Sequence, residues 1–288
     1  MSGQAEKAAR FRALHAAPGA FVIPNPWDAG TAKLLTSFGF PALATTSAGF
    51  AYSLGRPDGM GLLRREELLI NAADIAGATA LPVSGDLENG FGDRDLDIET
   101  TIIGASAAGL VGGSIEDATG NAEAPIYEFD TAVARIRTAA AAARSLPHDF
   151  VLVARAENFL HGRPDFDDTL KRLVAYAEAG ADCLYAPGVS DPESIKAIVR
   201  AVAPKPVNVL VPGKAGLSAA DLAALGVKRV SLGSALVRVC IGALMRAAEE
   251  ITIHGTFTAL HGAVAYGDVQ TRFRDLLERE RADAVGQG

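Results

Sequence analysis

Eight short apolar runs alternate with longer helical segments along most of the chain, and this alternation limits the folds that it can adopt. Strands that alternate with helices in this way usually pair in parallel, because each helix carries the chain back along the sheet. Eight such units predict a closed (β/α)8 barrel of the α/β class. The expected strands are 20–23, 41–46, 81–83, 110–115, 150–154, 183–186, 207–211 and 229–232.

The pattern contains no linker and no shift in composition that would divide the chain. We therefore expect one barrel domain over residues 1–288, whose last barrel helix ends near residue 250. The segment from about 250 to 288 is then a helical extension, with a helix at about 268–282. Apolar residues recur through it, among them Ile251, Phe257 and Phe273, and they predict packing against a neighbouring element or subunit.

Composition excludes several classes of protein. Hydrophobic residues make up 49% of the chain and charged residues 21%, which suits a large buried core. The net charge of −7 and the absence of a basic patch argue against a nucleic-acid partner. No apolar run reaches the roughly 18 residues of a membrane span, and the N-terminus has no apolar signal core. Two cysteines fit a reducing compartment, so we expect a cytoplasmic protein.

The stretch 81–93, LPVSGDLENGFGD, carries the strongest chemical signal. Its apolar start predicts a buried strand, which is followed by Asp86 and Glu88. Two positions apart on a strand, these carboxylates would lie on the same face. The glycines at 85, 90 and 92 would let the backbone approach a ligand closely. Mg²⁺ usually takes one or two protein carboxylates together with water and substrate, so the stretch suggests a divalent-metal site, although an acidic turn is the alternative.

Polar residues also follow the other predicted strands. The carboxyl ends of barrel strands meet at one mouth, where the chemistry of such barrels takes place. Three strands deliver carboxylates to this mouth and one delivers an arginine, which matches a carboxylate or phosphoryl group by a two-pronged hydrogen bond. A divalent metal that chelates a small anionic acid would satisfy both. The residues are Asn25, Trp27 and Asp28; Thr45, Thr46 and Ser47; Asp86 and Glu88; Glu116 and Asp117; Arg155 and Glu157; Asn208; and Ser234.

These strand ends resemble, in order, those of the isocitrate lyase / phosphoenolpyruvate mutase superfamily, in its phosphoenolpyruvate-mutase-like branch. The similarity covers about residues 20–240, and the ordered set is specific where single motifs are not. The matching stretches are NPWDA at 25–29, TTSAG at 45–49, GRPD at 55–58, DLENGFG at 86–92, GSIED at 113–117, VARAE at 153–157 and VNV at 207–209.

The resemblance implies a cofactor and its ligands. In the family, Mg²⁺ is held largely through water by the paired acids after strand three, here Asp86 and Glu88, and by the acid after strand four, here Glu116. Mn²⁺ is a possible substitute. The family more often has two aspartates in the pair, so Glu88 is a departure.

The resemblance also implies how a small anionic oxo acid would be bound. Arg155 corresponds to the arginine that grips the substrate carboxylate, and Asn208 to an asparagine that contacts substrate. Ser47 and Ala48 lie in the segment whose backbone amides hold that carboxylate. Asp58 corresponds to the aspartate of the loop after strand two, so the implied catalytic residues are Asp58, Arg155 and Glu116.

One loop departs from the family pattern. Isocitrate and methylisocitrate lyases carry a Lys-x-Cys-Gly-His motif after strand four, whose cysteine is the general acid. Here the loop 118–127 reads ATGNAEAPIY, without cysteine, histidine or lysine. We therefore do not expect isocitrate-type cleavage. What remains is a Mg²⁺-dependent lyase that acts on a small α-oxo or α-hydroxy acid through a metal-stabilised enolate. It would cleave a C–C or C–P bond, or decarboxylate or hydrolyse an oxaloacetate-like substrate.

Two other functions stay open at this point. The barrel could bind a metabolite without catalysis, or it could be a Schiff-base aldolase that uses Lys214. Some residues also have two interpretations: Glu157 is a ligand or a partner of Arg155, and His161 is an acid/base or a surface residue. Asp165, in a second GRPD at 162–165, and the two cysteines, Cys183 and Cys240, are expected to be structural.

The family exchanges its last barrel helices between two subunits and often pairs dimers into tetramers. For this chain the resemblance therefore implies a homodimer or homotetramer.

Overall fold

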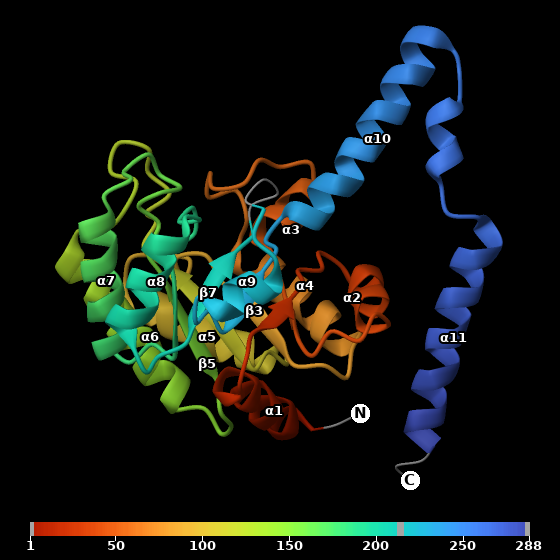
Figure 1. Cartoon of the computed structure of the whole chain (residues 1–288). Helices are drawn as coiled ribbons and strands as arrows, with labels where there is room; N and C mark the ends of the chain where they lie inside the picture. Colours follow the sequence, from red (N-terminus) through yellow and green to blue (C-terminus); the bar gives the residue numbers. More distant parts are fainter. Residues whose placement is uncertain (1–2, 212–215, 286–288) are drawn as a thin grey trace. The chain divides into compact units, whose positions relative to one another are not determined.

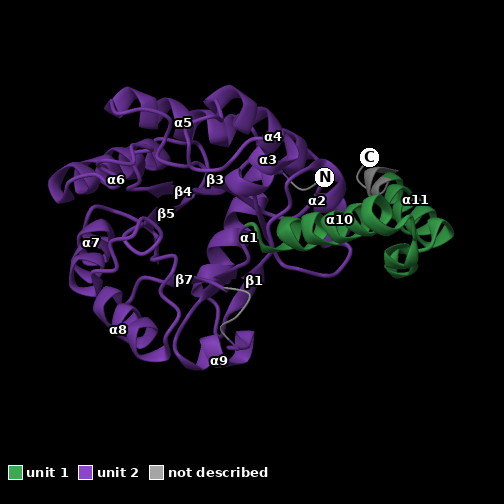
Figure 2. Cartoon of the chain, turned by 90° about the horizontal axis from the view of Figure 1, so that it is seen from above, with its two compact units in different colours: residues 1, 234–288 green, residues 2–233 purple. Residues whose placement is uncertain are grey.

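The structure is a computed structural model that describes residues 3–211 and 216–285. The chain forms two compact units that meet in sequence at Gly233 and Ser234 (Figure 2). The larger unit, residues 2–233, carries the predicted site. The proposed Schiff-base residue Lys214 lies outside the described residues.

The larger unit is a (β/α)8 barrel, as the alternation predicted (Figure 1). All neighbouring strands pair in parallel, in the order β1-β8-β7-β6-β5-β4-β3-β2. A backbone bond from the Ala44 amide to the Pro24 carbonyl, 3.0 Å long, joins the two ends of this sheet. The strands are β1 (Phe21–Ile23), β2 (Leu43–Ala44), β3 (Val83–Asp86), β4 (Gly112–Glu116), β5 (Val151–Arg155), β6 (Cys183–Tyr185), β7 (Val207–Leu210) and β8 (Arg229–Ser231).

Helices surround the strands (Figure 2), and several begin at the residues that the sequence indicates. Asp28 accepts the Thr31 amide at 2.7 Å, and Ser218 accepts the Asp221 amide at 3.1 Å, which are standard N-terminal caps. One short helix, α3, was not predicted. The helices are α1 (Gln4–Ala16), α2 (Ala29–Thr36), α3 (Ser47–Ser53), α4 (Arg65–Gly77), α5 (Asp95–Ala107), α6 (Phe129–Arg144), α7 (Phe166–Glu178), α8 (Pro192–Val202) and α9 (Ala219–Ala224).

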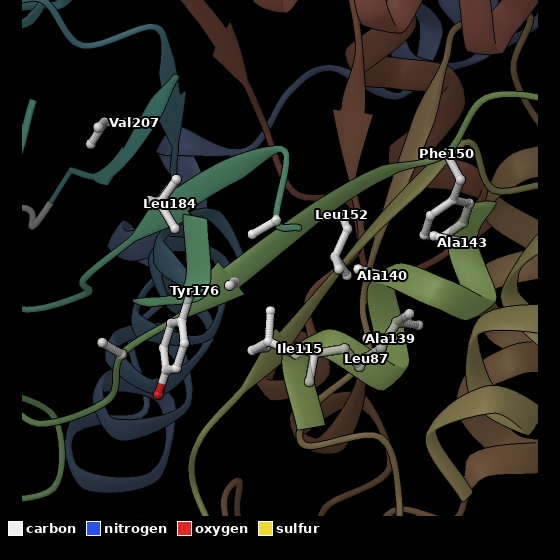
Figure 3. Packing of buried hydrophobic residues seen from close by; sticks show 14 of the residues in the cluster. Leu87, Ile115, Ala139, Ala140, Ala143, Phe150, Leu152, Tyr176, Leu184 and Val207 are labelled. Atoms are coloured by element: carbon white, nitrogen blue, oxygen red, sulfur yellow. The ribbon is translucent and has the colours of Figure 1, made fainter. Parts of the chain in front are cut away.

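The main apolar core lies between the strands and these helices (Figure 3). Leu87, which follows β3, is fully buried in it. A Cβ added to Gly85 would lie 2.8 Å from the Leu87 side chain, and one added to Gly113 would lie 2.6 Å from it. These two glycines thus make room for a core leucine, whereas we had expected Gly85 to admit a ligand. By anchoring Leu87, they fix where the chain turns at the mouth.

A second cluster lies at the opposite end of the barrel, which we call the floor. There Phe11 and His15 of α1 pack edge to face with Phe21 of β1. Arg229, at the start of β8, lies 5.7 Å from the centre of the Phe11 ring. Helix α1 therefore covers the end of the barrel that carries no predicted site residue.

The smaller unit is helical and follows Gly233. It contains α10 (Ala235–His254), a 3-10 turn η1 (Thr258–Gly262) and α11 (Tyr266–Val285), which includes the helix predicted at 268–282. Many of its apolar side chains are exposed, among them Leu244, Met245 and Phe257. Across the described ranges, no helix is both long and apolar enough to cross a membrane.

Candidate active site

Arg155 is the centre of the predicted site. It is the last residue of β5, and its guanidinium contacts three carboxylates, which lie at the ends of β3 and β4 and just after β5 itself. Nη1 lies 2.9 Å from Asp86, Nη2 lies 3.1 Å from Glu116, and Nε lies 2.8 Å from Glu157. Burial alone would lower the pKa of Arg155, but these carboxylates raise it well above the ordinary value. The arginine therefore stays charged at the mouth.

Asp86, the last residue of β3, receives hydrogen bonds from several directions. Its Oδ2 accepts the Ser47 amide at 3.1 Å and the Ser47 hydroxyl at 2.9 Å. Its own amide donates to the Thr45 hydroxyl at 2.9 Å. The segment 45–48, which we expected to hold a substrate carboxylate, thus positions Asp86 through Ser47. The Ala48 amide belongs to the first turn of α3, whose N–H groups have no acceptor within the helix.

Glu88 lies beyond the strand, so the prediction that it shares a strand face with Asp86 was wrong. Strand β3 ends at Asp86, and Glu88 adopts the left-handed conformation with φ 48°. Its carbonyl accepts the Glu116 amide at 3.0 Å, which ties this turn to β4. A glutamate rarely adopts such a backbone conformation, and strained residues of this kind cluster at functional sites.

Charge crowding affects the carboxyl groups at the mouth. Burial, and then the charges of Asp86 and Asp58, raise the pKa of Glu88 to about 7. Burial also raises the pKa of Glu116 well above its ordinary value; Arg155 opposes this shift, and Glu157 adds to it. These acids repel one another, and a further cation among them would relieve that repulsion.

Asp58 is carried by the loop between α3 and α4. Partial burial and the charge of Asp86 raise the pKa of its carboxyl group, so the loop brings it within electrostatic range of the mouth. Arg56 fixes this loop by a double hydrogen bond to Glu67, with distances of 3.0 and 3.1 Å.

Asn208 lies on β7, level with Tyr185 of β6 and Arg229 of β8. Its amide donates to the Ser231 hydroxyl at 3.0 Å, while its buried Oδ1 has no partner among the described residues. Tyr185, which was not predicted, also belongs to the site, and its ring centre lies 5.2 Å from the Arg155 guanidinium. Only the strand register, which pairs Arg155 with Tyr185, could have indicated it.

The contacts of the other predicted residues indicate their roles. Glu157 is a direct partner of Arg155, which favours that interpretation over a ligand role. Asp117 does not join the acids of the mouth, because its carboxylate bonds to Arg172 and Tyr176 of α7. Asp165 caps α7 through the Asp168 amide. His161, in the loop after β5, is partly buried, and its ring makes no hydrogen bond to the described residues.

The fit of a divalent cation can be judged from the donors. Within residues 3–211 and 216–285, no three His, Cys, Asp or Glu side chains are arranged to hold a metal by themselves. Asp86, Glu88 and Glu116 nevertheless offer hard oxygen donors with repelling charges. Mg²⁺ needs only one or two carboxylates when water and substrate supply the other positions. The donor chemistry therefore fits Mg²⁺ bound mainly through water.

The barrel and its mouth define an α/β-barrel protein with an acidic, arginine-centred site of the kind that binds small anions. Comparison with known proteins makes this specific. A sequence model of the phosphoenolpyruvate phosphomutase family matches residues 11–252. The chain belongs to this family, within the isocitrate lyase / phosphoenolpyruvate mutase superfamily.

Two relatives illustrate the similarity in sequence. An uncharacterised protein of Mycobacterium tuberculosis is 35% identical over 93% of this chain and 98% of its own length. The 2,3-dimethylmalate lyase of Eubacterium barkeri is 31% identical over 72% of this chain and 68% of its own length.

Two solved structures illustrate the similarity in fold. A Burkholderia cenocepacia J2315 protein, provisionally assigned as a lyase or mutase, is 57% identical with a TM-score of 0.90, covering 94% of this chain and 96% of its own. A phosphonopyruvate hydrolase crystallised with oxalate and Mg²⁺ is 25% identical with a TM-score of 0.82, covering 97% of each chain. The two relatives with an assigned activity are thus a lyase and a hydrolase.

Proposed function

We propose that the protein is a Mg²⁺-dependent lyase of a small α-oxo or α-hydroxy carboxylic acid, acting through a metal-stabilised enolate. The observation that carries the proposal is the position of Arg155 among Asp86, Glu116 and Glu157 at the mouth. The phosphonopyruvate hydrolase relative, which binds oxalate and Mg²⁺, supports the same chemistry.

In this proposal Arg155 binds the substrate carboxylate by two parallel hydrogen bonds, while Glu157 keeps hold of Nε. The Ala48 amide and Asn208 Oδ1 or Nδ2 add contacts from the two sides. Asp86, Glu88 and Glu116 would hold Mg²⁺, which when bound would polarise the oxo group and stabilise the charge of an enolate. Asp58, at the edge of the mouth, would accept or donate a proton during the reaction.

The hairpin after β4 limits the type of reaction. Residues 118 and 126 form an antiparallel bridge, and the Thr119 hydroxyl accepts the Asn121 amide at 2.9 Å. Because the hairpin offers no thiol, imidazole or ammonium, it lacks the general acid that the loop cysteine provides in isocitrate and methylisocitrate lyases. This favours substrates whose products need no proton from the loop. Loss of carbon dioxide, or cleavage of a C–C or C–P bond by water, meets that condition.

Turnover of a panel of oxo and hydroxy acids, with Mg²⁺ and with EDTA, tests the proposal. We expect Mg²⁺-dependent cleavage of at least one acid and competitive inhibition by oxalate. Binding of oxalate without any turnover would indicate a silent metabolite-binding barrel. Substrate trapping by borohydride, insensitive to EDTA, would indicate a Schiff-base enzyme and overturn the proposal.

Arg155→Lys provides a sharper test once a substrate is known. Lysine keeps the charge but cannot make two parallel bonds, so we expect a loss of about 2–3 kcal/mol in transition-state binding. Steady-state kinetics would show this as a reduced kcat/KM. An unchanged kcat/KM would remove Arg155 from the substrate site.

We further propose that the protein is a cytoplasmic homodimer or homotetramer whose C-terminal helices pack against another copy. Exposed apolar side chains on α10, η1 and α11 support this, because patches of this kind usually mark interfaces. Light scattering at micromolar concentration should give a dimer or tetramer mass. A monomer mass near 29.8 kDa would contradict it.

A further inference from the structure

Asp117 has a set of contacts that the proposed chemistry does not use. It follows Glu116 directly, yet its side chain is only 2% exposed. Oδ2 accepts the Tyr176 hydroxyl at 2.6 Å and Arg172 Nη1 at 3.1 Å. Oδ1 accepts the backbone amide of Glu157 at 2.8 Å. One buried carboxylate therefore joins the end of β4, the end of β5 and helix α7.

The first arm of this network reaches the hairpin 118–126. Arg172 Nη1 donates both to Asp117 and to the Tyr127 carbonyl, which lies 2.9 Å away. The Tyr127 amide in turn donates to the Asp117 carbonyl at 2.8 Å. Because one guanidinium nitrogen serves both acceptors, a displacement of the hairpin's end at Tyr127 must disturb the Arg172–Asp117 bond.

The second arm reaches the substrate arginine. Asp117 holds the Glu157 amide, and the Glu157 carboxylate holds Arg155 Nε at 2.8 Å. Glu157 is 2% exposed, so its side chain has little freedom to reorient independently of its backbone. A shift of the Asp117 carboxylate is therefore passed to the Arg155 guanidinium through a single intervening residue.

We propose that Asp117 is a positioning residue that couples the hairpin 118–126 to the orientation of Arg155. The proposal deepens the function proposed above, since it rests on Arg155 as the group that binds the substrate anion. Arg172 and Tyr176 hold the Asp117 carboxylate in place from α7. Figure 3 shows the Tyr176 ring beside buried apolar side chains, with its hydroxyl directed away from those that are labelled. The ring fixes the hydroxyl, and the hydroxyl fixes Asp117.

Hydrogen exchange tests the coupling without any ligand. Thr119→Ala removes the hydroxyl that bonds within the hairpin to Asn121 and Ala124. We expect exchange to speed at least about threefold in the peptide 155–160 as well as in the hairpin. Thr100→Ala, which removes a comparable bond on the surface of α5, is the matched control and should change exchange only locally. No change at 155–160 would overturn the coupling.

A double variant shows whether the effect of Thr119→Ala on hydrogen exchange at 155–160 passes through Asp117 or directly from β4 to β5. Tyr176→Phe deletes one of the bonds that hold Asp117 and keeps the ring. If Asp117 transmits, the effect of Thr119→Ala at 155–160 should shrink in the Tyr176→Phe background. An effect of undiminished size would show that it travels directly between the strands, and the proposal would fail.

Ligand binding supplies the readout that a merely structural role would not change. We expect Tyr176→Phe and Asp117→Asn to weaken oxalate binding in the presence of Mg²⁺, the latter by about 10- to 100-fold, as for other partners of site residues. Because Arg155 also contacts the proposed metal ligands Asp86 and Glu116, the affinity for Mn²⁺ alone, followed by electron paramagnetic resonance, should fall by much less than the affinity for oxalate. A parallel loss of both affinities, or of neither, would refute positioning.

The two proposals fail in different ways. If the wild type binds no oxalate with Mg²⁺, the proposed function fails, and hydrogen exchange still decides whether the hairpin and the peptide 155–160 are coupled. If the wild type binds oxalate and the Tyr176→Phe and Asp117→Asn variants bind it equally well, the positioning role alone fails.

Discussion

Two arginines, one half-buried at the mouth of the barrel and one buried at its floor, have opposite surroundings. Arg155 contacts three carboxylates. Arg229 makes one long hydrogen bond, to the Ser84 hydroxyl at 3.4 Å, and lies over the Phe11 ring, while its Nε and Nη1 have no hydrogen-bond partner among the described residues. Burial lowers the pKa of Arg229, whereas the carboxylates around Arg155 outweigh burial and raise its pKa.

The difference separates charge that is arranged for a ligand from charge that the fold only tolerates. At the mouth the carboxylates outnumber the arginine, so a metal ion and an anionic substrate can both be accommodated. At the floor a cation is buried beside aromatic rings and a histidine, and burial lowers its pKa by more than the charge of Asp86 raises it. A buried charge without a partner is unfavourable to stability.

The largest effect should come from the mouth. Asp86→Ala removes the acceptor shared by Arg155 and Ser47 and one expected metal ligand. We expect Mg²⁺-dependent turnover to fall at least about 10⁴-fold, a loss of several kcal/mol of charge stabilisation, with an unchanged circular dichroism spectrum. Turnover that persists in this variant, or in the wild type with EDTA, would remove the metal from the mechanism.

Replacing each arginine by methionine should change stability in opposite directions. Arg155→Met leaves three carboxylates without a counter-charge, so we expect it to lower the free energy of unfolding by about 3 kcal/mol. Arg229→Met replaces an unpaired cation by an apolar chain of similar length and should be neutral or stabilising by about 1–2 kcal/mol. Urea denaturation of both variants measures this. A loss of equal size in the two would abolish the distinction between mouth and floor.

The floor should also respond to acid through His15. Burial, and then the charge of Arg229, lower the pKa of His15 to about 3 from 6.5. The unfolded chain therefore binds this proton more readily, and the histidine's contribution to stability is complete above pH 6.5 and is lost as the pH falls towards 3. Between pH 7 and 4.5 it should account for about 2 kcal/mol of lost stability. His15→Gln, compared by urea denaturation at both values, should lose correspondingly less.

The smallest effect should follow from blocking thiols. Burial raises the pKa of Cys183 to about 12, so it stays protonated and unreactive, whereas Cys240 is exposed on α10. N-ethylmaleimide should modify Cys240 alone and leave turnover within about twofold. Strong inhibition, or efficient cleavage of isocitrate or methylisocitrate, would mean that a thiol acts as the general acid after all.

Only the mouth half of this contrast could be predicted from the sequence; the floor could not. Asp86, Glu116 and Arg155 could be placed together because parallel strands of a barrel end at one mouth, and that rule depends only on the order of strands. Arg229 begins β8 at the other end, and its lack of partners depends on which side chains α1 brings beneath the barrel. Sequence pattern does not fix such packing.

Local conformation explains the other differences. The prediction for Glu88 assumed that the strand continued past Asp86, but buried Leu87 turns the chain and Glu88 takes a positive φ. Asp117 looked equivalent to Glu116 in sequence. Successive side chains of a strand point to opposite faces, so Glu116 reaches Arg155 while Asp117 reaches α7. The register of β5 with β6, which brings Tyr185 under Arg155, is a tertiary property.

The order of strands also has a consequence for synthesis of the chain. Strand β1 (Phe21–Ile23) pairs along its length with β8 (Arg229–Ser231), and just beyond its end Pro24 accepts a backbone bond from Ala44 of β2. While the chain is being made, β2 to β7 can pair with neighbours as they emerge from the ribosome. The first strand made, β1, keeps an unpaired edge until the last strand of the barrel, β8, has been made. The barrel sheet of a nascent chain therefore cannot close until residues 229–231 have emerged from the ribosome, however much of the core has already formed.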